Sequence, residues 1–267
     1  MKKLLVLILL IVVSNIYSQE IITDRPDKTE SVETVGKGKF QIETGMEYTS
    51  FTYGDIFGYI DDTTSVTFTN LKSRTLTLPT TLIRYGISKN VELRLSFNFD
   101  KQSYNDDRLI VNELSLNAPR IGTKIHLYDG KEYMPAISFI GSVTIPGIGA
   151  KDKKTDYLNP ELLLAFSNDL NENLSLGYNL GIEHDYDNKA TNLFYSASLG
   201  IGLTPKLGAF AELYGNFPND DYSSHQNIDG GFTYLIQNNI QVDVYGGIGL
   251  SSVSNNFMLG TGIAYKF

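Results

Sequence analysis

The stretch 257–267 (FMLGTGIAYKF) limits the possible folds of this chain more than any other part of its sequence. Side chains of a β-strand point alternately to its two faces. One face here would carry Phe257, Leu259, Thr261, Ile263, Tyr265 and Phe267, and the other Met258, Gly260, Gly262, Ala264 and Lys266. An apolar outer face, a lumen face of small residues and aromatic residues at the water interface are typical of outer-membrane β-barrels. The pattern predicts the closing strand of such a barrel.

The same alternation recurs along the rest of the chain. It predicts an all-β fold, a closed antiparallel transmembrane β-barrel of about 12 strands. The predicted strands are 39–53, 64–85, 91–103, 111–128, 133–146, 158–168, 173–184, 191–203, 207–217, 224–236, 240–252 and 257–267.

The connections between these strands alternate in length. Short ones are expected at 86–90, 129–132, 168–172, 204–206 and 237–239, and longer, more polar ones at 54–63, 104–110, 147–157, 185–190 and 218–223. Bacterial outer-membrane barrels have short periplasmic turns and longer extracellular loops. We therefore expect both ends of the barrel sequence on the periplasmic rim.

Two prolines interrupt the predicted strands. Near Pro119 the apolar residues change from one face to the other, which predicts a β-bulge. Pro79 lacks a backbone N–H and predicts a second irregularity.

The N-terminus resembles a secretory signal peptide. Lys2 and Lys3 precede ten apolar residues, 4–13, which are too few to cross a bilayer as a helix. We expect cleavage after Ser18, then a segment 19–38 that lies in the periplasm or the lumen, and the outer-membrane barrel over 39–267. No later stretch is long and apolar enough for a transmembrane helix.

Composition excludes several functional classes. Cleavage would leave 20 basic against 30 acidic residues, which argues against nucleic acid as a partner. The chain has no cysteine, so disulfides, thiol catalysis and a lipoprotein anchor are excluded. No spacing suggests a metal site, and we expect no cofactor.

Charged residues on the predicted lumen face are candidates for controlling selectivity. They are Glu43, Glu47, Glu92, Arg94, Arg120, Lys124, Glu161, Glu212 and Asp243. Their alternative role is structural, because charges within a membrane usually pair with one another. Lumen-facing glycines are equally open to two interpretations: they leave room for solute, or they let neighbouring aromatic side chains pack closely.

Outward aromatic residues are expected near the periplasmic rim. Aromatic girdles mark the membrane interfaces of such barrels. The predicted girdle consists of Phe40, Phe166, Tyr234, Tyr265 and Phe267.

Several short motifs resemble a family of bacterial outer-membrane transporters known as the meta-pathway of phenol degradation family. The resemblance rests on 24–26 (DRP), 29–31 (TES), 35–43 (VGKGKFQIE), 83–87 (IRYGI) with 91–94 (VELR), and 142–146 (SVTIP). It implies a closed barrel and the passage of small, including aromatic, molecules.

The function predicted from these observations is passive uptake of small solutes across the outer membrane. The alternative is a non-conducting barrel with a structural or surface-interaction role. A lipid hydrolase is third, because His225 follows Ser223 and Ser224, but an enzyme is not expected. Expected partners are outer-membrane lipids, a small-molecule solute and the barrel assembly machinery, through the strand that ends at Phe267.

Overall fold

The computed structural model describes residues 21–52, 56–59, 65–68, 71–105, 113–219, 224–251 and 257–267. The expected signal peptide, 1–18, lies outside these residues. Within them, no helix is long and apolar enough to cross a membrane.

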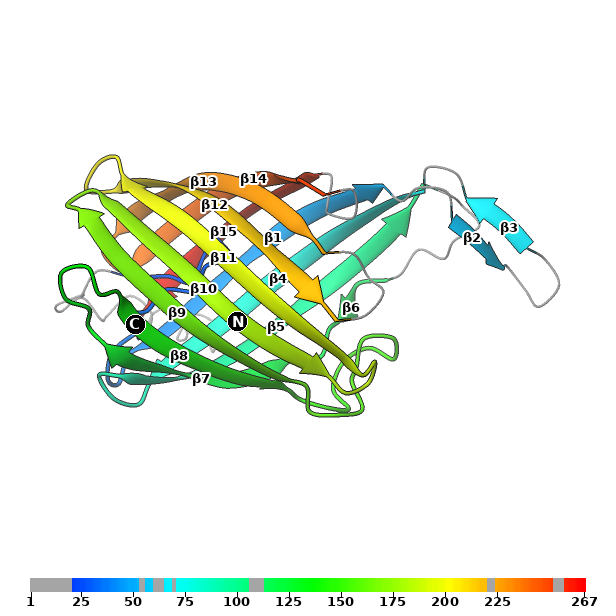
Figure 1. Cartoon of the computed structure of the whole chain (residues 1–267), viewed down its shortest axis with the longest axis horizontal. Coiled ribbons are helices and arrows are strands. Elements are labelled where there is room, and N and C mark those ends of the chain that lie inside the picture. Colours follow the sequence, from blue (N-terminus) through cyan, green and yellow to red (C-terminus); the bar gives the residue numbers. More distant parts are fainter. Residues whose placement is uncertain are drawn as a thin grey trace, which may run out of the picture.

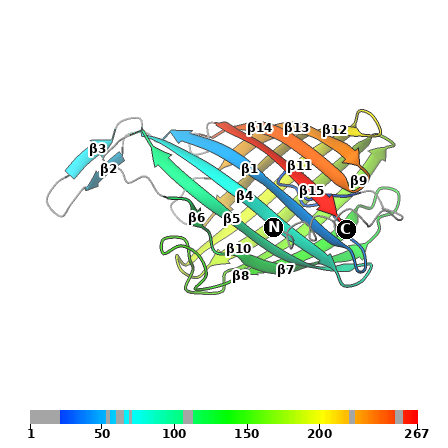
Figure 2. The same cartoon turned by 180° about the vertical axis from the view of Figure 1, so that it is seen from behind.

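Twelve antiparallel strands form a closed transmembrane β-barrel, as the alternation predicts (Figures 1 and 2). Closure is made by β1, which pairs with β15 on one side and β4 on the other. The barrel strands are β1 (Phe40–Thr52), β4 (Lys72–Gly86), β5 (Val91–Tyr104), β7 (Arg120–Tyr128), β8 (Ala136–Thr144), β9 (Pro160–Asn171), β10 (Leu174–Asp185), β11 (Ala190–Gly202), β12 (Leu207–Pro218), β13 (Gln226–Gln237), β14 (Ile240–Gly249) and β15 (Phe257–Lys266).

Three further strands are short. β2 (Ile56–Tyr59) and β3 (Ser65–Phe68) form a hairpin that projects beyond one end of the barrel (Figure 1), and β6 (Ser115–Leu116) pairs with β5. The prediction of one strand over 64–85 and a loop over 54–63 was therefore wrong. The neighbours of β4 end opposite its first residues, Lys72 and Ser73, so no barrel partner reaches β3.

Both predicted proline irregularities are present. At Pro79 the register of β4 shifts between Thr77 and Thr80 against β5, and opposite the same residues against β1. At Pro119 the predicted single strand 111–128 is divided into β6 and β7, so the interruption is a break rather than a bulge within one strand. The backbone N–H of Ile145 donates to the Pro119 carbonyl (2.8 Å), which keeps the break paired.

The short connections gather at one end of the barrel, here called the short-turn end. They are 87–90, 172–173, 203–206 and 238–239, together with 129–135, which is longer than the predicted 129–132. The opposite end, the long-loop end, carries the hairpin and the other connections. The connection predicted at 185–190 is shorter than expected, with only 186–189 between its strands.

Burial in this barrel is inverted relative to a soluble protein. Outward residues such as Leu180 and Leu193 are 58% and 53% exposed, whereas the inward Glu43, Arg84 and Lys124 are completely buried. Charges cannot face hydrocarbon cheaply, so strand alternation places the polar residues in the interior. The interior is therefore where a site must be sought.

Candidate functional site in the barrel lumen

Residues 21–37, here called the lumen segment, fold into the barrel interior. The segment begins and ends at the short-turn end, where Ile21 N donates to the Asn238 carbonyl (2.8 Å) and Gly38 N, just after the segment, donates to the Gly86 carbonyl (2.8 Å). In between it turns back on itself, because the Asp24 carboxylate accepts from the Ser31 backbone N–H (2.9 Å) and hydroxyl (2.7 Å). The far end of this loop, 27–30, is called the tip.

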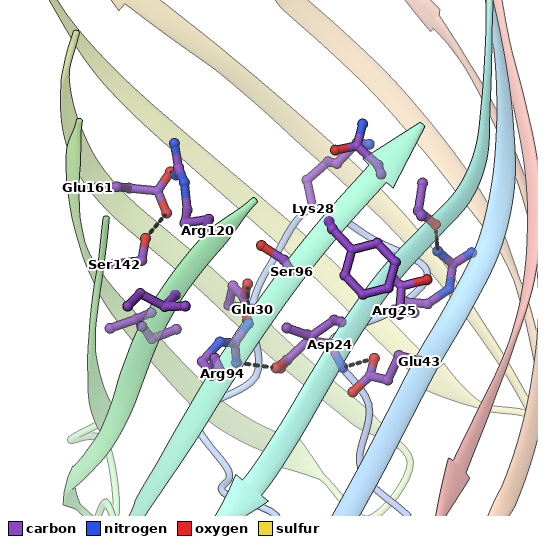
Figure 3. Close-up of a pocket in the computed structure, with 18 residues that line it drawn as sticks. Asp24, Arg25, Lys28, Glu30, Glu43, Arg94, Ser96, Arg120, Ser142 and Glu161 are labelled. Atoms are coloured by element: carbon purple, nitrogen blue, oxygen red, sulfur yellow. Dashed lines mark hydrogen bonds and ion pairs between the residues drawn. The ribbon is translucent and has the colours of Figure 1, made fainter. Parts of the chain in front are cut away.

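Asp24 holds the segment to the wall. Its carboxylate lies 2.6 Å from Arg94 Nη1, 2.9 Å from Lys124 Nζ and 3.2 Å from Arg84 Nη1. All three cations come from neighbouring strands, β4, β5 and β7, and Figure 3 shows Arg94 meeting Asp24 beside Glu30. A single side chain of the segment is thus surrounded by three positive charges.

Wall carboxylates complete this group, here called the charged cluster: Asp24, Glu30, Glu43, Arg84, Glu92, Arg94 and Lys124. Arg84 binds Glu92 through Nε (2.9 Å) and Glu43 through Nη1 (3.0 Å), and Arg94 makes two 2.7 Å bonds to Glu30. Three cations face four carboxylates, all in the barrel interior. Such a buried network is stable only while every charge keeps its partners.

Arg25 makes a second ion pair, with Asp243 of β14 (3.1 Å), and also donates to the Thr80 hydroxyl (3.0 Å). Its guanidinium lies on Gly45 and Gly262, which are directly paired residues of β1 and β15. A Cβ at either position would overlap the Arg25 side chain. The two glycines are therefore required for the close approach of Arg25 to the wall.

The tip crosses the lumen and contacts the opposite wall. Lys28 N donates to Glu212 (2.7 Å), and Glu30 N donates to Asn179 Oδ1 (2.7 Å). The Thr29 hydroxyl bonds to Glu212 and to Ser196 Oγ (2.8 Å). These contacts come from β10, β11 and β12.

The Lys28 side chain makes the one ion pair of the tip outside the charged cluster that is seen among the described residues. It binds Glu47 (2.9 Å), which also accepts from the Tyr245 hydroxyl (2.7 Å). The Lys28 side chain is 42% exposed. Apart from the Glu30 carboxylate, which belongs to the charged cluster, the tip is consequently held mainly by hydrogen bonds.

The returning half of the segment packs on an apolar part of the wall. Val32 is buried against Ile140, Leu163 and Ala165, the hydrophobic cluster of the interior. Its carbonyl accepts from the Ser138 hydroxyl. This contact fixes the segment against β8 and β9.

Cavities remain on both sides of the tip. Toward the long-loop end there is one of about 400 Å³, partly drawn in Figure 3, and another of about 310 Å³. Toward the short-turn end there is one of about 700 Å³ and another of about 480 Å³. Glu30 lines both the 400 Å³ and the 700 Å³ cavity, so the tip is the partition between them.

Some lumen glycines let aromatic rings pack closely and others leave open space, so each of the two predicted roles applies at different positions. Aromatic rings lie over Gly181 and Gly260, since a Cβ there would overlap Phe194 and Tyr245 respectively. Gly202 is open, because a Cβ would find its nearest atom at 3.7 Å. Some glycines thus accommodate rings, and others leave space.

The predicted lumen residues fall into separate groups. Glu43, Glu92, Arg94 and Lys124 join the charged cluster, whereas Glu47, Glu212 and Asp243 bind other parts of the lumen segment. Arg120 and Glu161 pair with each other nearer the long-loop end, where Ser142 donates to Glu161 (3.3 Å; Figure 3). Whether any of them sets selectivity stays a prediction.

Three members of the charged cluster were absent from the predicted set: Asp24, Glu30 and Arg84. Arg84 is completely buried, and Asp24 is its partner from the segment. Ile83 and Tyr85 are apolar, so their alternation about Arg84 could have identified it as inward-facing. Nothing in the alternation could have identified Asp24, because it lies outside any strand.

The predicted girdle residues lie near the short-turn end. Phe267 packs against Phe40 (ring centroids 5.5 Å apart) and Tyr265 (4.4 Å), and Phe166 stacks on Tyr178 (5.0 Å). Tyr234 is 47% exposed on the outer face. Their anchoring role in a membrane stays a prediction.

A polar contact joins two loops at the other end. Asp187 accepts from Asp156 N (2.8 Å) and Asn159 Nδ2 (3.0 Å). These hydrogen bonds hold the pKa of Asp187 below its ordinary value, because they stabilise the charged carboxylate. In the described part of the chain no group of three His, Cys, Asp or Glu residues could hold a metal ion.

Solved structures share this fold at low sequence identity. The COG4313 outer membrane channel from Pseudomonas putida F1 superposes with a TM-score of 0.69, at 13% identity over 92% of this chain and 100% of that one. The translocator domain of the autotransporter NalP from Neisseria meningitidis gives 0.51, at 11% identity over 87% and 89%. The KdgM porin in complex with disordered oligogalacturonate gives 0.50, at 11% identity over 84% and 99%.

No curated protein matches the sequence. A family profile does, over residues 23–267, which include most of the lumen segment and every barrel strand. The chain belongs to the family described as "Putative MetA-pathway of phenol degradation".

Proposed function

We propose that this protein is an outer-membrane channel through which small solutes move passively. The observation that carries the proposal is the partition of the lumen. Cavities of about 400 Å³ and 700 Å³ lie on opposite sides of the tip and share Glu30. Displacement of the tip, in which Glu30 would leave Arg94, would therefore join spaces that reach toward the two ends of the barrel.

The direction of the channel follows from general barrel architecture. Short turns face the periplasm in bacterial outer-membrane barrels, and long loops face outward. Solute would first meet the long-loop end, pass the tip and leave beside the turns. The chain supplies no energy source for this movement, so the flow follows the concentration gradient.

Aromatic solutes are the class that the lining favours. Phe194 and Tyr214 line the 310 Å³ cavity before the tip, and Phe210 lines both cavities beyond it. Offset and edge-to-face contacts with these rings would favour a small aromatic molecule. The family description, which refers to phenol degradation, agrees with this class.

A non-conducting barrel is the second candidate, favoured by the many bonds that the lumen segment makes. If the tip never leaves Asn179, Ser196 and Glu212, the lumen stays closed and the protein has a structural role. A lipid hydrolase finds less support, because His225 lines an interior cavity rather than the lipid-facing wall. Ser223 lies outside the described residues.

A reversible lock separates the two candidates. Thr29 Oγ1 lies 2.8 Å from Ser196 Oγ, and the chain contains no cysteine, so Thr29→Cys with Ser196→Cys would create its one disulfide. Liposome swelling would be measured with sugars, amino acids and small aromatic solutes, before and after reduction. A channel should swell liposomes only when the disulfide is reduced, and the two single variants should ignore the reductant. No swelling from folded wild-type barrel with any solute would establish the non-conducting candidate.

A further inference from the structure

The wall beneath the tip carries two carboxylates side by side. Glu212 of β12 and Asp229 of β13 are directly paired residues that both face the lumen. They are 1% and 5% exposed. Like charges at directly opposite positions of a sheet destabilise it, and burial increases the cost.

The two carboxylates differ in their hydrogen bonds. Glu212 accepts from the tip, through Lys28 N and the Thr29 hydroxyl. Neither carboxylate oxygen of Asp229 has a hydrogen-bond partner among the described residues, although both are buried. A buried group of this kind needs a specific explanation. Within a membrane protein it is a candidate functional group.

The surrounding residues do not neutralise the negative charge of the Asp229 carboxylate. The titratable groups that face this pair are Asp27 and Lys28 of the tip, Glu47 of β1 and Tyr214 of β12. The Lys28 ammonium is bonded to Glu47, and the Tyr245 hydroxyl donates to the same carboxylate. Glu47 is also near Arg25, whose guanidinium is already paired with Asp243. Asp27, Glu47, Glu212 and Asp229 therefore share one ammonium group and this paired guanidinium.

We do not infer a metal ion as the missing partner. The described residues contain no group of three carboxylates or imidazoles arranged to bind one. A proton is the simplest alternative, since a protonated carboxyl gains an O–H donor that can bond to its neighbour.

We propose that the docked tip requires a proton shared between Glu212 and Asp229, and that loss of this proton releases the tip. The docked state then binds more protons than the released state, so acid favours docking and alkali favours release. This inference rests on the proposed function where it concerns flow: the proton would close the channel. The docking equilibrium itself does not depend on conduction.

Cysteine labelling tests the docking equilibrium directly. Ser196 lies under Thr29, so the Ser196→Cys thiol should react with a water-soluble maleimide only when the tip is released. The reference is Lys206→Cys, an exposed position in the turn 203–206 at the short-turn end. The ratio of the two rates cancels the intrinsic pH dependence of thiol labelling. We expect this ratio to rise about tenfold from pH 5 to pH 8, within the tenfold-per-unit limit of a single linked proton.

Asp229→Asn places a neutral amide donor beside Glu212 and imitates the protonated state. In this variant the ratio should stay low and constant across the pH range. Glu212→Gln neutralises the other member of the pair and should also give a constant ratio. Either variant is sufficient for the test if the other fails to fold. Asp169→Asn, an exposed acid at the short-turn end, should keep the wild-type response.

A full pH response in a folded Asp229→Asn or Glu212→Gln barrel would overturn the inference, as would a constant wild-type ratio. The outcome is independent of solute flux. A pH-dependent labelling ratio without liposome swelling would support proton-dependent docking and contradict the proposed channel function. Liposome swelling with a constant labelling ratio would support the channel function and contradict proton-dependent docking.

Discussion

The lumen segment is held at two places that differ in kind. At the charged cluster, Asp24 meets three cations and every charged partner on the wall is almost fully buried. The Glu30 carboxylate belongs to the charged cluster. The rest of the tip bonds through backbone N–H groups and one hydroxyl to Asn179, Ser196 and Glu212, and through a partly exposed Lys28 ion pair to Glu47, beside cavities on both sides. Breaking a buried ion pair costs more than losing a hydrogen bond. One end of the loop is therefore an anchor, and the other is the part that can move.

The largest effect should come from the anchor. Arg84→Met would leave Glu43 and Glu92 buried without their main cation. We expect the free energy of unfolding, measured in detergent with urea, to fall by about 3–5 kcal/mol. Arg120→Met is the matched control, because its ion pair with Glu161 is partly exposed and should contribute less than about 1 kcal/mol. Equal losses from both variants would remove the distinction between the buried cluster and the exposed pair.

Asp24→Asn should release the segment while the barrel stays folded. The amide cannot replace a carboxylate that bonds to Arg94 and Lys124, and each such bond contributes about 1.5–3 kcal/mol. Trypsin should then cleave after Lys28 at least about tenfold faster, since 1.4 kcal/mol corresponds to a tenfold change. Unchanged cleavage would show that the segment is held by its other contacts.

A smaller effect is expected where the tip touches glycine. A Cβ on Gly177 would lie 3.1 Å from the Thr29 methyl group, so Gly177→Ala should push the tip away at a cost of about 1 kcal/mol. Tryptic cleavage after Lys28 should rise about fivefold, the equivalent of that energy. Gly202→Ala, whose nearest atom is at 3.7 Å, should behave as wild type. Similar rates for both variants would indicate that the tip does not rest on Gly177.

A similarly small effect should follow Tyr245→Phe, which removes the hydroxyl that donates to Glu47. We expect a loss of about 1 kcal/mol in the free energy of unfolding, because Glu47 keeps its bond to Lys28. Tyr234→Phe changes an outward tyrosine and should have no measurable effect. A larger loss would mean that Glu47 contributes to the anchor.

The barrel could be predicted because the membrane requires apolar side chains on the outer face of every strand. This requirement appears in the sequence as an apolar residue at every second position. The alternation also placed Glu43, Glu92 and Lys124 inside. It failed at β3, where four residues alternate equally well in a local hairpin and in a longer strand. Which of the two structures forms depends on backbone pairing with neighbouring strands, and therefore on where those strands end.

The partners of the lumen segment could not be predicted for a different reason. Asp24 lies in irregular backbone with no period, and its three cations come from β4, β5 and β7. Such a convergence depends on the diameter of the closed barrel and on the path of the chain inside it. The alternation reports which face a residue occupies, but not which residue it meets across the lumen.

The position of the anchor partners also constrains the order of folding. The segment binds residues from Glu43 of β1 to Asp243 of β14, strands that become near neighbours through β15 only when the barrel closes. Arg25 spans this seam, because it binds Asp243 of β14 and donates to the Thr80 hydroxyl of β4. Both contacts can exist together only in the closed barrel, so the lumen segment completes its docking after the first and last strands have joined.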